Sequence, residues 1–280
     1  MSSAIKPSRW ILKKAARLGV ASLSAPKALV PRVIGSEPVF RVLTYHRFGP
    51  CHRMPFSLDL KTFERQIRYL AEQKLAASLS DLERYAGGGL HIDRNRVLVT
   101  IDDGDPSVFE IALPILRQYG IPAVAFVLPA AVPGFPAMTN AQLRELAANG
   151  VAIGSHSVNH RSMARISAHE AAHEAQESRD RLEQALGEPV RAFAYPFGTR
   201  SDVSPEAAHA VQSAGYTLAF TSLHGPVRPG VEPLMIPRIK IESGDPDWMF
   251  PAICGGSLDL WRIVDTVLPM LQRPQRVVYP

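Results

Sequence analysis

The chain has 280 residues, of which 46% are hydrophobic and 20% charged, which excludes a disordered protein and supplies enough apolar material for a core. Its 31 basic and 26 acidic residues leave a net charge of +5, and the sequence contains no nucleic-acid-binding module, so no nucleic-acid partner is expected. Two cysteines, Cys51 and Cys254, are too few for a disulfide scaffold. No apolar run reaches the roughly 18 to 20 residues of a membrane-spanning helix.

Residues 1–36 form a basic segment without an acidic residue. Its basic residues are Lys6, Arg9, Lys13, Lys14, Arg17, Lys27 and Arg32. Because these charges recur until Arg17, the segment does not have the unbroken apolar stretch of a secretory signal. We therefore expect the leader of a cytoplasmic protein rather than a secretion signal. It would be either an amphipathic helix in peripheral contact with an anionic membrane or a poorly ordered segment.

From residue 37 the sequence alternates β-rich runs with helical patterns, in about seven units. The β-rich runs span residues 39–45, 97–101, 123–128, 151–155, 190–195, 216–221 and 234–241. Such alternation predicts an α/β fold in which helices wrap a parallel sheet. No linker divides the chain, so we expect one domain over residues 37–250, followed by a C-terminal helix and tail over residues 251–280.

One expected helix, residues 167–186, contains His169-Glu170-Ala171-Ala172-His173, which matches the zinc-protease signature H-E-x-x-H. The helical context argues against a protease. The expected apolar stripe is formed by Ala168, Ala171, Ala172, Ala175, Leu182 and Leu186. Both histidines fall on the opposite, polar face, so we expect them to point to solvent.

Polar residues follow the predicted strands at the points where the strands end. These residues are His46, Asp102, Asp103, His156, His160 and the segment 195–198. In parallel α/β barrels the chemistry lies at the carboxyl ends of the strands. We therefore expect these side chains to gather on one rim.

Asp102 and Asp103 are adjacent, and neighbouring side chains of a strand point to opposite faces. Both can serve one site only where the chain leaves the strand, which Gly104 permits. One carboxylate could then bind a cation while the other stays free as a base. A simple Asp-Asp-Gly turn is the alternative. A calcium loop is excluded, because Leu113 and Pro114 stand where its glutamate would be.

His156 and His160 lie four residues apart just beyond a predicted strand. Two histidines and one carboxylate form a recurring catalytic zinc site, which leaves a fourth position for water or substrate. Together with the aspartate pair, they predict a metal site. Other divalent ions also suit these ligands.

Three segments carry a resemblance to a known family: Thr100-Ile101-Asp102-Asp103-Gly104, Ser155-His156-Ser157-Val158-Asn159-His160 and Ala194-Tyr195-Pro196-Phe197-Gly198. They resemble the first three motifs of the polysaccharide deacetylases, the NodB-homology group or carbohydrate esterase family 4. With segments 43–48 and 63–70, the chain is most similar to the branch containing the biofilm poly-N-acetylglucosamine deacetylases. The resemblance covers roughly residues 40–240 and implies a distorted (β/α)7 TIM-like barrel.

By this resemblance, Asp103, His156 and His160 would hold one divalent metal ion, usually zinc in this family. Asp102 would be the general base that removes a proton from the attacking water. His46, from the opening Tyr-His motif, would give the proton that the leaving sugar amine needs.

The resemblance also implies contacts with the substrate or its oxyanion at Tyr195, Phe197 and Gly198, with the backbone N–H of Phe197 as oxyanion donor. The sequence departs from the family pattern in two places. No histidine after residue 241 can supply the C-terminal acid of many relatives. Tyr195 stands where many relatives carry an arginine, and either Arg191 or Arg238 would have to take its role.

The expected activity is metal-dependent removal of N-acetyl groups from an acetylated, amino-sugar-containing glycan. Two alternatives stay open. One is an O-acetyl esterase that uses the same metal centre, and the other is a carbohydrate-binding barrel that has lost catalysis. The sequence identifies neither the glycan nor its carrier.

Overall fold

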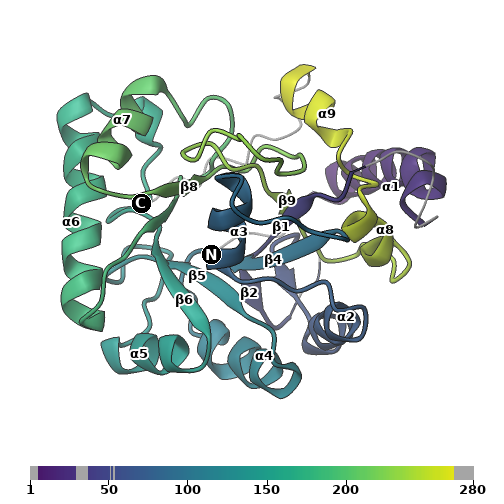
Figure 1. The fold of residues 1–280 in the computed structure, drawn as a ribbon, viewed down its shortest axis with the longest axis horizontal. Helices are drawn as coiled ribbons and strands as arrows, with labels where there is room; N and C mark the ends of the chain where they lie inside the picture. Colours follow the sequence, from purple (N-terminus) through teal and green to yellow (C-terminus); the bar gives the residue numbers. More distant parts are fainter. Residues whose placement is uncertain (1–5, 30–36, 51, 53, 268–280) are drawn as a thin grey trace.

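The computed structural model describes residues 6–29, 37–50, 52 and 54–267. Within this part of the chain, seven parallel strands form one sheet in the spatial order β8-β7-β6-β5-β4-β1-β9. They are β1 (Phe40–Tyr45), β4 (Arg96–Ile101), β5 (Ala123–Val127), β6 (Val151–Ser155), β7 (Ala192–Ala194), β8 (Leu218–Phe220) and β9 (Ile239–Lys240). The sheet curls into a half-barrel (Figure 1), which confirms the predicted distorted (β/α)7 barrel. Two short strands, β2 (Arg47–Phe48) and β3 (Ser57–Leu58), pair separately.

Helices surround the sheet (Figure 1). They are α1 (Pro7–Leu29), α2 (Leu60–Glu72), α3 (Leu79–Ala86), α4 (Leu113–Tyr119), α5 (Asn140–Ala148), α6 (Ala168–Leu186), α7 (Pro205–Ser213), α8 (Met249–Gly255) and α9 (Trp261–Val267). A π-helical turn, Val108–Ala112, precedes α4, and a 3-10 turn, Met163–Arg165, precedes α6. The expected C-terminal region therefore begins with two helices, and residues 268–280 lie outside the described chain.

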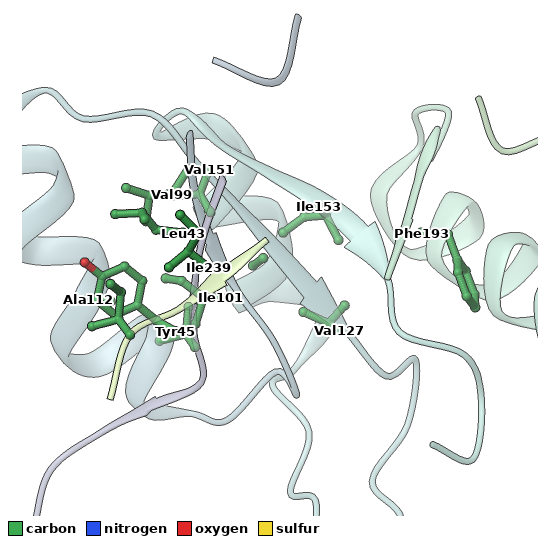
Figure 2. Packing of buried hydrophobic residues seen from close by; sticks show 14 of the residues in the cluster. Leu43, Tyr45, Val99, Ile101, Ala112, Val127, Val151, Ile153, Phe193 and Ile239 are labelled. Atoms are coloured by element: carbon green, nitrogen blue, oxygen red, sulfur yellow. The ribbon is translucent and has the colours of Figure 1, made fainter. Parts of the chain in front are cut away.

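Alternate residues of each strand pack on opposite faces of the sheet, as the period of a strand requires. Leu43 of β1 belongs to the cluster that includes Phe63 of α2, whereas Val42 belongs to a second cluster with Phe126 of β5. Figure 2 shows the first cluster, in which Ile239 of β9 pairs with Leu43. Full burial of each such side chain contributes about 1.5 to 3 kcal/mol to the free energy of folding. Together the two clusters stabilise the curved sheet.

The segment after β8 connects the two ends of the sheet. Ile236 forms a parallel bridge with Phe220 of β8, and β9 then pairs with β1. A single strand is predicted over residues 234–241, but the structure divides it, because Pro237 has no N–H to donate to a ladder. Arg238 lies in this divided segment, between the two pairings. The other six predicted runs each overlap an observed strand.

Helix α1 comes from the basic leader of residues 1–36, and it packs against α8. The Nζ atom of Lys13 lies 2.7 Å from Glu242, and Nζ of Lys14 lies 2.7 Å from Asp245. A guanidinium nitrogen of Arg17 is also 2.7 Å from Asp245, and Arg17 is 1% exposed. Three basic residues of the N-terminal segment therefore form ion pairs with acidic residues of the same chain. Residues 30–36 lie outside the described part, and membrane contact stays a prediction.

Helix α6 carries the H-E-x-x-H pattern on its solvent side. His169 and His173 are exposed, as predicted. The buried stripe differs from the expected one, because Ala168 and Ala172 are exposed as well. The buried residues of α6 are Ala171, Glu174, Ala175, Ser178 and Leu182. Among the described residues, no helix is both long and apolar enough to cross a membrane.

Candidate metal centre

Asp102 and Asp103 lie where β4 ends and the chain turns out of the sheet. The N–H of Asp102 still donates to the carbonyl oxygen of Tyr45 at 3.0 Å, whereas Asp103 has a φ of 73° and Gly104 a φ of 69°. A Cβ atom at position 104 would lie 3.1 Å from the Cβ of Val127. Both the positive φ and this close approach require glycine. The turn gives the two adjacent carboxylates different positions on the same rim.

Asp103, His156 and His160 form one cluster. The Nε2 atoms of both histidines lie 3.5 Å from Oδ1 of Asp103, and one ligand atom from each residue lies within 4.8 Å of the others. The Nδ1 atom of His156 lies 2.8 Å from the carbonyl oxygen of Ala194. Because a carbonyl only accepts, Nδ1 carries the proton, and Nε2 presents a lone pair to the cluster.

The spacing within the cluster fits a shared divalent cation. An N–H···O hydrogen bond normally measures about 2.7 to 3.2 Å, which is shorter than the 3.5 Å between each Nε2 and Asp103. Ligand bonds of about 2.1 Å at tetrahedral angles separate two ligand atoms by about 3.4 Å. Burial alone would raise the pKa of the Asp103 carboxyl, but its imidazole neighbours hold it well below its usual range, so the group is ionised as a ligand must be. Asp103, His156 and His160 would therefore hold the ion.

The loop that carries His160 is held by a residue that the sequence analysis did not identify. Glu174 of α6 is 2% exposed, and its Oε2 accepts the N–H of Val158 at 2.8 Å and that of Asn159 at 2.9 Å. The Oγ of Ser157, whose φ is 66°, accepts the N–H of His160 at 3.0 Å. A signal was present in the sequence, because Glu174 falls on the apolar stripe of α6, where a charged residue needs buried partners.

Asp102 is buried against Arg238 in a fork-shaped pair. Nη1 of Arg238 donates to Oδ1 at 2.7 Å, and Nη2 donates to Oδ2 at 2.8 Å. The guanidinium also donates to the carbonyl oxygen of Thr221 at 2.8 Å and to Oγ1 of Thr100 at 3.2 Å. Burial alone would raise the pKa of the Asp102 carboxyl, but Arg238 holds it below its ordinary value. Of the two arginines left open by the sequence, the structure selects Arg238, since Arg191 is exposed.

His46 follows β1 and lies near the same carboxylates. Its ring packs on Phe56 with a centroid separation of 4.5 Å. Burial lowers the pKa of His46, against the effect of Asp103 and Asp102, which favour the charged form. Among the described residues, the buried Nδ1 atom of His46 has no hydrogen-bond partner.

Phe197 and Gly198 form the turn after β7, with φ values of 61° and 58°. The Phe197 ring lies 4.8 Å from the ring of His160, which places the turn beside the cluster. The side chain of Tyr195 is not at the rim: it is fully buried and packs on Phe193 in the core. The structure therefore exposes no atom of Tyr195 to a substrate.

These features define a class of protein: a parallel α/β half-barrel with a three-residue cluster that could hold a metal ion and a buried Asp-Arg pair at the carboxyl ends of its strands. Residues 91–219 match the family model described as polysaccharide deacetylase. In this region, a little under half of the chain, the sequence is similar to the polysaccharide deacetylase family.

Known proteins of this kind are distant from the chain in sequence. The solved structure of IcaB from Ammonifex degensii has a TM-score of 0.68 at 28% identity, over 78% of this chain and 97% of that one. YxkH of Bacillus subtilis, named for the same family, is 24% identical over 53% of this chain and 52% of its own, so the chain spans about half the length of that relative. The poly-β-1,6-N-acetyl-D-glucosamine N-deacetylase of Staphylococcus aureus is 25% identical over 67% of this chain and 69% of its own.

Proposed function

We propose that the protein is a metal-dependent hydrolase that removes N-acetyl groups from an amino-sugar-containing glycan. The observation that carries the proposal is the cluster of Asp103, His156 and His160 on the same rim as the ionised pair of Asp102 and Arg238. The name of the S. aureus relative supports amide cleavage on a polymer of N-acetylglucosamine. Zinc is the ion proposed, since two imidazoles and one carboxylate form a common catalytic zinc site.

Asp102 is the proposed general base. A bound divalent ion supplies Lewis-acid polarisation of the acetyl carbonyl and makes water more acidic. Asp102 takes the proton of the attacking water. Arg238 keeps this carboxylate ionised and fixes its orientation through both oxygens. The backbone N–H of Phe197 donates to the tetrahedral oxyanion.

His46 is the proposed proton donor to the sugar amine. Because burial lowers its pKa, the imidazole is neutral at rest and must first take up a proton from solvent. Once charged, it is a stronger acid than an ordinary histidine, which suits protonation of an amine as the C–N bond breaks. Overall, water adds across the amide, and acetate and a free sugar amine leave.

The test combines elemental mass spectrometry of the purified protein with acetate release from N-acetylglucosamine oligomers. We expect one divalent ion per chain, lost together with acetate release in the variant His156→Ala/His160→Ala. The matched control is His169→Ala/His173→Ala, which removes two exposed histidines with the same spacing. This control should keep both the ion and the activity.

The proposal is wrong if the exposed pair, rather than the rim pair, carries the ion. Acetate released from acetylated xylan and not from N-acetylglucosamine oligomers would show an O-acetyl esterase instead. A bound ion and bound sugar without acetate release from either substrate would show a carbohydrate-binding barrel without catalysis.

A further inference from the structure

Two loops of the rim are joined by one buried carboxylate. The β6 loop, residues 156–167, carries His160, and the β7 loop, residues 195–204, carries Phe197. The ring centroids of these two residues lie 4.8 Å apart. Asp202 belongs to the β7 loop, is 5% exposed and binds side chains of both loops. Its carboxylate therefore connects the part of the chain that holds a metal ligand with the part that holds Phe197.

Each oxygen of the Asp202 carboxylate binds a different loop. Oδ1 accepts the hydroxyl of Ser162, in the β6 loop, at 2.7 Å. Oδ2 accepts the hydroxyl of Thr199, in the β7 loop, together with the Thr199 N–H at 3.3 Å. The backbone adds a second link, because the carbonyl oxygen of Asp202 accepts the N–H of Ala164 at 3.2 Å. We call this set of contacts the Asp202 bridge.

The bridge lies close to two strained residues. His160 has a φ of 53° and Phe197 a φ of 61°, a left-handed conformation that bulky side chains rarely adopt. Such conformations persist only where the surrounding contacts hold them. Ser162 is two residues after His160, and Thr199 is two residues after Phe197. The bridge therefore holds both loops directly beside the points where the backbone is strained.

Other contacts hold each loop separately. Glu174 of α6 binds two backbone N–H groups of the β6 loop. In the β7 loop, the carbonyl oxygen of Gly198 accepts the N–H of Ser222 at 2.8 Å. An exposed contact crosses between the loops, from Nη2 of Arg165 to Oγ of Ser201 at 3.1 Å, but contacts at exposed positions contribute little. The spacing between the loops therefore depends mainly on the bridge.

We propose that Asp202 is a positioning residue that sets the distance between the metal ion at His160 and the backbone N–H of Phe197. The proposal rests on the proposed function, in which the ion and this N–H stabilise the same tetrahedral oxyanion. Asp202 acts on the transition state, because the oxyanion exists only there. It does not act on metal affinity, since Glu174 still holds the β6 loop when the bridge is lost.

The test compares Asp202→Ala with the wild type, both as the metal-containing full chain. We expect kcat to fall about 10- to 100-fold, because a misplacement of about 1 Å can have such an effect. KM for N-acetylglucosamine oligomers, and metal affinity in a chelator competition, should change little. Asp202→Asn keeps the size of the side chain and an acceptor for Ser162 but loses the acceptor for the Thr199 N–H. Its kcat should fall between the other two.

Calorimetric titration separates this role from a loss of folded protein. One ligand is a glucosamine trimer whose central amine carries a methylphosphonyl group, so that a tetrahedral phosphorus replaces the acetyl carbon. The other ligand is the unmodified trimer, which is the reaction product. In Asp202→Ala the affinity for the phosphorus compound should fall by the same factor as kcat/KM, and the affinity for the trimer should not change. A partly unfolded variant would instead bind fewer molecules of both.

Asp81→Ala is the matched control. Asp81 also accepts a backbone N–H and a hydroxyl, both from Ser78, at 3.0 Å and 2.8 Å, but it caps α3 and does not join two loops. This variant should keep the kcat and both affinities of the wild type. Ser201→Ala, which removes the exposed contact with Arg165, should do the same.

Wild-type kcat and phosphorus-compound affinity in Asp202→Ala would overturn the positioning role. Metal affinity that falls in step with kcat would also overturn it. The two proposals fail separately. Acetate release that is equal in the wild type and Asp202→Ala would remove the positioning role and keep the hydrolase. A wild type that releases no acetate from any glycan, yet prefers the phosphorus compound to the trimer only while Asp202 is present, would do the reverse. A wild type with neither acetate release nor this preference would overturn both.

Discussion

Replacement of Arg238 with methionine should destabilise the protein by about 3 to 5 kcal/mol at neutral pH. Arg238 is fully buried, Asp102 is 3% exposed, and both carboxylate oxygens bind the guanidinium. Methionine fills much of the same space but leaves a buried carboxylate without its cation, and removal of one partner of a buried pair has about that cost. In a chain of this size, the loss corresponds to a fall of about 10 °C in Tm.

The loss of stability in Arg238→Met should depend on pH, and the direction of this dependence follows from the pKa of Asp102. In the wild type the folded-state pKa lies below the ordinary value. The stabilisation that the Asp102 carboxylate contributes is therefore fully present above the unfolded-state pKa of about 3.9. It is lost as the pH falls through the folded-state pKa. In Arg238→Met, burial still raises the pKa of the carboxyl, and only the smaller effects of His156 and His46 oppose it, so the carboxyl destabilises the fold increasingly as the pH rises. The difference between the two proteins should be largest at pH 7 and shrink toward pH 4.

Urea unfolding of the metal-free proteins at both pH values measures this difference. The double variant Arg238→Met/Asp102→Asn, without either charge, should recover most of the lost stability and none of the activity. Arg94→Met, at an exposed pair with Asp93, is the matched control and should unfold like the wild type. A loss below about 1 kcal/mol at pH 7, or a loss that does not vary with pH, would refute the reasoning.

Three further outcomes are expected. Glu242→Gln removes the buried carboxylate that pairs with the cations of α1 and should lower the free energy of unfolding by about 3 kcal/mol. An unchanged urea midpoint would mean that α1 is held by other contacts. Glu174→Gln should weaken metal binding about 10- to 100-fold in a chelator competition, because it removes the charged acceptor that holds the His160 loop. A metal affinity equal to that of the wild type would show that the loop keeps its conformation without this carboxylate. His46→Ala should lower kcat about 10²- to 10⁴-fold with little change in KM, and a wild-type kcat would exclude His46 as the proton donor.

The residues of the metal cluster could be predicted because each lies within five residues of the end of a strand. Asp103 is the second residue after β4 and His156 is the first after β6, and the carboxyl ends of parallel strands in one sheet meet at one edge. The turn at Gly104 could also be predicted from the sequence, because adjacent carboxylates cannot share a site inside a pleated strand.

Other features depend on tertiary contacts that no local pattern records. The sequence could not decide whether Arg238 or Arg191 pairs with Asp102, since this depends on how the segment after β8 packs against β8 and β1. The basic pattern of Lys13, Lys14 and Arg17 suits a membrane surface as well as it suits acidic partners far along the chain. Tyr195 adjoins a rim motif, yet its side chain packs into the core.

The docking of α1 has a consequence for how the chain folds as it is made. Lys14 and its partner Glu242 are 228 residues apart in sequence. At a synthesis rate of roughly 5 to 20 residues per second, the helix waits on the order of 10 to 50 seconds before that acid is made. Its attachment is therefore a late event of assembly, and it holds the same C-terminal stretch that carries Arg238 to its position against Asp102.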